Sequence, residues 1–147
     1  MSDTDMIDLY SGRILAMATD MPRTARLAAP DATARKRSPL CGSTVTVDVV
    51  VTGGKVSDYG QDVKACVLGQ AAAAVIGAQI VGLTPDQIRK GRDQLHAMLK
   101  DDGPVPETPF DALEVLHPAR DYKNRHASIM LAFDATLAAL SEIQTDA

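Results

Sequence analysis

The sequence predicts an α+β fold in which about four to five helices cover one face of a small antiparallel three-stranded sheet. Valines alternate with polar residues over 44–51, which is the period-two pattern of a half-buried strand. Gly53-Gly54 supplies a tight hairpin turn before a weaker return strand at 56–63. After Cys66 the period changes to that of helices, and strands followed by helices are typical of the α+β class. The length of 147 residues predicts a single domain spanning 1–147.

Each element has its own signal. Apolar residues at three- and four-residue steps predict a helix over 6–20. The segment 22–39 holds three prolines and a basic cluster, and it connects this helix to the sheet through one short strand at 33–37, because two strands alone are marginal. An alanine-rich buried helix is expected over 67–76, and a second helix over 84–100. A loop, a short helical turn and a last helix, from 121–125 to about 143, complete the chain.

Two of these features carry more detail. Thr84, Pro85 and Gln87 have the spacing of an N-cap, a first-turn proline and a capping box. The basic cluster is interpreted as a solvated face, with partner docking as the alternative. Its members are Arg23, Arg26, Arg35, Lys36 and Arg37.

Composition and charge exclude several functions. Fifteen basic and nineteen acidic residues give a net charge of −4, which argues against broad phosphate binding. Aromatic residues make up 3% of the chain with no Trp, so stacking platforms for nucleic acid are not expected. No uninterrupted apolar run reaches 18 residues, and the first five residues are acidic rather than signal-like. We expect a cytoplasmic protein that binds neither nucleic acid nor membrane.

The two cysteines are the strongest candidates for chemistry. Cys41 precedes the main strand and Cys66 follows the return strand, each 12 or 13 residues from the turn centre. A symmetric hairpin therefore brings them together at its open end. Cys66 begins a helix, whose N-terminus stabilises a thiolate. The alternative interpretation is that both cysteines are simply small, buried hydrophobic residues.

These segments resemble the U-type iron–sulfur cluster assembly scaffolds, the IscU/SufU/NifU N-terminal domain family, over nearly the whole chain. Family members have a Cys-Gly-Asp segment that opens a strand, a hairpin, and a Cys that starts an alanine-rich helix. Here the matching segments are Cys41-Gly42-Ser43 and residues 65–74. Residues 117–120 and 131–135 resemble the family's last proline-containing segment and last helix. The resemblance implies a transient iron–sulfur cluster, a cysteine desulfurase as sulfur donor and apo-proteins as recipients.

The departures from the family concern its metal ligands. The family has three cysteines and an aspartate, but Ser43 stands at the aspartate position and Ser128 at the position of the third cysteine. Serine is a poor ligand for iron or zinc. His126 is the candidate replacement, because it heads an apolar helical stripe and is expected to point inward while Ser128 points outward. The candidate metal set is therefore Cys41, Cys66, His126 and Ser43, and a hydrogen-bonded core histidine is the alternative for His126.

Three functions follow from this set. The leading one is a non-enzymatic scaffold or carrier that binds iron, a cluster or zinc through Cys41 and Cys66. The second is a degenerate scaffold homologue with a regulatory or zinc-binding role and no cluster assembly. The third is an enzyme that uses Cys66 as nucleophile and His126 as base, for which no local signature exists. His96 and His117 lack metal-ligand spacing and are expected on the surface or in packing.

Overall fold

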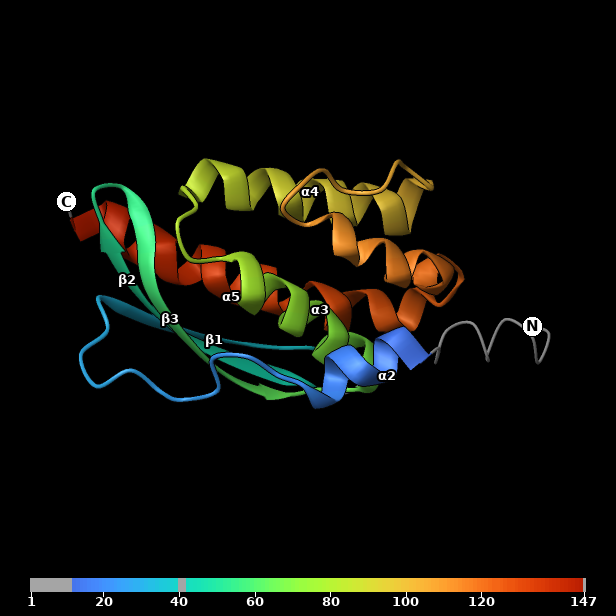
Figure 1. Cartoon of the computed structure of the whole chain (residues 1–147), viewed down its shortest axis with the longest axis horizontal. Coiled ribbons are helices and arrows are strands. Elements are labelled where there is room, and N and C mark those ends of the chain that lie inside the picture. The colour runs from blue at the N-terminus through green and yellow to red at the C-terminus, as the bar shows by residue number, and fades with distance from the viewer. Residues whose placement is uncertain (1–11, 40–41, 147) are drawn as a thin grey trace.

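A three-stranded antiparallel sheet forms one side of the protein in its computed structural model, which describes residues 12–39 and 42–146. The strands are β1 (Ala32–Arg37), β2 (Thr44–Thr52) and β3 (Lys55–Lys64), with β2 in the centre. Helices α3 and α5 pack on one face of the sheet, and α4 lies outside them (Figure 1). The α+β prediction with helices on one face is confirmed. The helices are α2 (Gly12–Thr19), α3 (Val67–Gln79), α4 (Pro85–Asp101), the 3-10 helix η1 (Asp111–Asp121) and α5 (Lys123–Asp146).

The hairpin and the capped helix form as their residues predict. Gly53 and Gly54 both have positive φ, at 61° and 78°, which the tight turn between β2 and β3 requires. At the start of α4, Thr84 Oγ1 accepts from the backbone N–H of Gln87, whose side chain accepts from the N–H of Thr84. The backbone N–H groups of Thr84 and Gln87 are therefore both satisfied. The expected helix over 6–20 is described from Gly12 onward, and its first residues lie outside the described part of the chain.

The segment that follows α2 covers the other face of the sheet. This corrects the expectation that β2 is a half-buried strand with its polar side chains in solvent. Asp48 points to this face and is fully buried. Its carboxylate accepts hydrogen bonds from Arg26 Nε at 2.6 Å and Nη2 at 3.1 Å, from Leu27 N at 3.0 Å and from Thr33 Oγ1 at 2.6 Å. Arg26 therefore binds a buried carboxylate and is not simply part of a solvated basic face.

Helix α5 is the central element of the core. It packs against β1, β2 and α3 on one side and α4 on the other, and Phe133 meets Phe110 edge-on at 5.1 Å between ring centroids. Its stretch Lys123–Ile143 is long and apolar enough to cross a membrane by length and composition alone, although 61% of that window is buried inside the protein. This apolar character therefore agrees with its place in the core.

Candidate functional site

The candidate site lies at the end of the sheet opposite the hairpin. Thr44 at the start of β2 pairs with Lys64 at the end of β3, so the chain enters and leaves the hairpin at one place. Cys66 follows two residues later as the N-cap of α3, with an extended backbone and no side-chain cap hydrogen bond. Its thiol is partly exposed and forms no disulfide. The predicted position of Cys66 at a helix start is confirmed.

Two serines form a chain of contacts with Cys66. The Oγ of Ser128 on α5 lies 3.5 Å from Cys66 Sγ, and it donates to Ser43 Oγ at 3.0 Å. Ser43 and Ser128 are 5% and 1% exposed. These three side chains thus meet although they come from segments far apart in sequence: the residues before β2, the start of α3 and the start of α5.

A glycine on α3 permits this contact. A Cβ added at Gly69 would lie 2.7 Å from Ser128 Oγ and 2.9 Å from Ala65 Cβ. Only a residue without a side chain lets α3 and α5 approach this closely. Gly69 is a positioning residue that the sequence patterns did not indicate, and its place one turn after Cys66 is the only signal of its role.

Cys41 falls outside the described residues, so its predicted proximity to Cys66 stays a prediction. The residues around it are fixed by backbone hydrogen bonds. Ser38 N donates to Ser43 O at 2.8 Å, and Gly42 N donates to Ser38 O at 2.9 Å. Gly42 has φ +72°, a left-handed backbone conformation that favours glycine.

His126 occupies a different side of α5 from Ser128. Its Nε2 donates to the carbonyls of Ala119 at 3.0 Å and Arg120 at 3.1 Å, and its Nδ1 is buried without a hydrogen-bond partner in the described structure. Burial, followed by the nearby positive charges of Lys100 and His96, lowers the pKa of His126, although the two carbonyls oppose this shift. The ring is therefore neutral at pH 7.

The expected orientation is thus correct for His126 and wrong for Ser128. Both are buried, because α5 has packed neighbours on opposite sides rather than one apolar face and one solvent face. The hydroxyl that contacts Cys66 belongs to Ser128, whereas His126 faces backbone carbonyls about 200° away around the helix. The role of His126 as a ligand, or as a base for Cys66, gains no support from these contacts.

Within the described residues, no group of three or more His, Cys, Asp or Glu side chains could hold a metal ion. His117 Nε2 lies 2.9 Å from Asp102 Oδ1, and its Nδ1 lies 3.2 Å from Arg120 Nη1. His117 therefore belongs to a surface network, as expected, and His96 lines a cavity beside His126.

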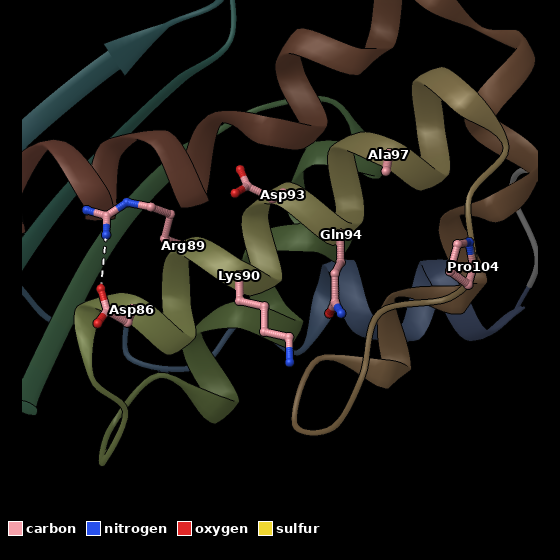
Figure 2. Close-up of a pocket in the computed structure, with 7 residues that line it drawn as sticks. All are labelled: Asp86, Arg89, Lys90, Asp93, Gln94, Ala97 and Pro104. Atoms are coloured by element: carbon pink, nitrogen blue, oxygen red, sulfur yellow. Dashed lines mark hydrogen bonds and ion pairs between the residues drawn. The ribbon is translucent and has the colours of Figure 1, made fainter.

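A cavity of about 500 Å³ lies elsewhere, on the outer side of α4 (Figure 2). Its charges are matched locally. Asp86 accepts from Arg89 at 3.2 Å, and Lys90 pairs with Glu107 at 2.8 Å. The cavity is lined by α4 and the following loop and contains none of the site residues, so it takes no part in the chemistry of Cys66 and the two serines.

Comparison with known proteins identifies solved structures with the same fold. Neither the protein-family models nor the curated proteins contain a match. A nitrogen-fixing NifU-like protein (N-terminal) from Brucella abortus is 45% identical, with a TM-score of 0.95 over 97% of this chain and 99% of that one. A candidate iron–sulfur cluster assembly scaffold for the SUF system from Fervidobacterium islandicum AW-1 shares 19% identity. Its TM-score is 0.82 over 91% of this chain and 98% of that one, which is a likeness of fold alone.

Proposed function

Because this chain belongs to the NifU-like N-terminal family, we propose that it is a non-enzymatic scaffold or carrier for iron–sulfur clusters. The observation that carries the proposal is the meeting of Ser43, Cys66 and Ser128. The family resemblance assigns these three positions to metal ligands, and in this chain they are in contact. The cluster is cargo, held transiently and passed to other proteins.

Cys41 and Cys66 are the proposed protein ligands. Thiolate is the ligand that iron–sulfur clusters prefer, and the chain has two cysteines in all. Cys66 is well placed because its partly exposed sulfur lies at the start of α3, beside the hydroxyl of Ser128. Cys41, which directly precedes Gly42 in the sequence, is expected to supply the second sulfur.

The two serines make this site weaker than a site with three cysteines and an aspartate. Hydroxyls are poor ligands, and these two already bond to each other. Their O–H groups can instead donate to sulfur, which lowers the charge density on a bound thiolate. The site therefore suits weak, transient holding, with remaining ligands from a thiol in solution or from a partner. A cysteine desulfurase as sulfur donor and apo-proteins as recipients are the partners proposed from the family.

Anaerobic reconstitution with ferrous iron and sulfide tests the function. We expect visible absorption of a cluster and bound iron and sulfide, both of which Cys66→Ser and Cys41→Ser abolish. A Ser43→Asp/Ser128→Cys variant should hold the cluster longer, since it returns the family's two missing donors. Ser141→Cys, which adds a thiol on an exposed part of α5, is the matched control and should leave retention unchanged. Failure of the wild-type chain and of the restored variant to load would overturn the proposal.

A regulatory or zinc-binding homologue is the second candidate. The mutual hydrogen bond of Ser43 and Ser128 favours it, because these hydroxyls replace the two strongest donors that the family adds to the cysteine pair. Zinc bound with iron excluded, together with cluster retention only in the restored variant, would favour this function. His126→Ala distinguishes the two ligand sets, since unchanged metal stoichiometry places His126 in the core.

A further inference from the structure

A basic groove runs beside the candidate site on the other side of α5. It consists of two adjoining cavities of about 410 and 310 Å³ that share Arg92, Ala127 and Asp134. The first lies between the end of β1 and α5, and the second between α4 and the start of α5. Its charged lining is formed by Lys36, Arg37, Arg92, Lys100, Lys123 and Asp134.

The groove carries excess positive charge on an acidic protein. Arg92 is matched by Asp134 at 3.2 Å and by Asp93 at 3.3 Å. Lys36, Arg37, Lys100 and Lys123 are exposed and form no ion pair within residues 12–39 and 42–146. The chain as a whole has a net charge of −4, so a cluster of four unmatched cations marks a surface for an anionic partner.

The groove adjoins the site through two residues. Ala127 lines both cavities and directly precedes Ser128. Ser38 lines the first cavity, and its N–H donates to the carbonyl of Ser43. A partner held in the groove would therefore contact residues that are joined through the backbone to Ser43 and to Ser128.

The length of the groove favours a polypeptide over a small anion. Its lining on α5 runs from Lys123 to Ala138, which is about 22 Å along the helix axis. An extended peptide of about seven residues covers that length. Leu131 lines the first cavity and Met130 the second, so each cavity offers an apolar side chain besides its cations.

We propose that this groove binds an extended acidic peptide segment of a protein that delivers to, or receives from, the adjacent cysteine site. The role given to the partner protein rests on the proposed scaffold function. The peptide-binding surface itself needs no cluster, so it is tested on the metal-free chain. Failure of peptide binding and failure of cluster loading are then separate results.

The test is fluorescence anisotropy with a labelled seven-residue peptide containing four glutamates separated by glycines. At low salt we expect binding that the matched glutamine peptide lacks and that weakens as salt rises. Lys36→Glu/Arg37→Glu and Lys100→Glu/Lys123→Glu should each lower the affinity about tenfold. The control Lys55→Glu/Arg89→Glu makes the same change in net charge on exposed positions outside the groove and should leave the affinity nearly unchanged.

Two results would overturn the proposal. An equal loss of affinity in the control would show a response to net charge alone. Equal affinity for glutarate and for the peptide would show a site for small anions.

Discussion

Two buried polar clusters flank the sheet, and they differ in their charge and in their exposure. On the outer face, the carboxylate of Asp48 accepts four hydrogen bonds of 2.6–3.1 Å, two of them from Arg26. At the end of the sheet, Ser43, Cys66 and Ser128 are linked by one hydroxyl hydrogen bond of 3.0 Å and one sulfur–oxygen contact of 3.5 Å. The first cluster is charged and closed, whereas the second is neutral at its serines and includes a partly exposed thiol.

This difference separates a structural role from a binding role. A buried carboxylate with all its lone pairs engaged has nothing left for a ligand, and its removal leaves donors unpaired. Neutral hydroxyls beside a partly exposed thiol cost less to rearrange than a buried ion pair does. The Asp48 cluster therefore fixes the segment that covers the sheet, and the Ser43–Cys66–Ser128 cluster can open toward a metal or a partner.

The largest expected effect on stability comes from Asp48→Asn. The amide removes the charge and turns donor groups toward Arg26 and Thr33, so we expect a loss of about 3 kcal/mol in the free energy of unfolding. Urea denaturation measures this loss. Alkylation of Cys66 under native conditions should be unchanged, because the site lies at another part of the sheet.

Asp101→Asn is the matched control for this prediction. Asp101 is exposed at the end of α4, away from the Asp48 cluster, and its substitution should change stability by less than about 0.5 kcal/mol. Equal, small losses in both variants would mean that the Asp48 cluster does not fix the covering segment.

The sequence predicted most of the fold but only part of the site, for identifiable reasons. The valine alternation, the Gly53-Gly54 turn and the Thr84 capping box are local signals, and each formed as expected. The burial of Asp48 depends on a segment about 20 residues away, which no local pattern reports. The helical wheel placed Ser128 outward because it assumed that α5 has one buried face, whereas α3 and α4 bury it from two sides.

Gly69→Ala should combine a stability loss with a change at the site. The added methyl meets Ser128 Oγ and Ala65 Cβ, so α3 and α5 must separate, and we expect a loss of about 2 kcal/mol. Unlike Asp48→Asn, this variant should also alter the alkylation rate of Cys66. Gly12→Ala on α2, where an added Cβ meets open space, is the control and should not destabilise the protein. An unchanged alkylation rate in Gly69→Ala would contradict the positioning role.

Acid should affect the Asp48 cluster in a defined pH window. The hydrogen bonds from Arg26 are the main cause that lowers the pKa of Asp48 below its ordinary value of 3.8, so the folded state binds this proton less readily than the unfolded state. The resulting stability is present above about pH 4 and is lost as the pH falls below it. The difference in unfolding free energy between wild type and Asp48→Asn should therefore shrink from pH 5 to pH 3. A constant difference over that range would show that the charge of Asp48 does not contribute.

The smallest expected effect, from Ser128→Ala, is the most direct test of the contrast between the clusters. Ser128 is as deeply buried as Asp48, but its hydroxyl joins two neutral or weakly polar partners, so we expect a loss of at most about 1 kcal/mol. Ser128→Ala should still load an iron–sulfur cluster, because the proposed ligands are Cys41 and Cys66. Ser128→Cys should retain the iron–sulfur cluster for longer than wild type, at similar stability. Denaturation and anaerobic loading of both variants measure these effects side by side. A loss in Ser128→Ala as large as that in Asp48→Asn would show that the serine pair holds the fold together as the Asp48 cluster does. The site would then lack the freedom to rearrange that holding an iron–sulfur cluster requires.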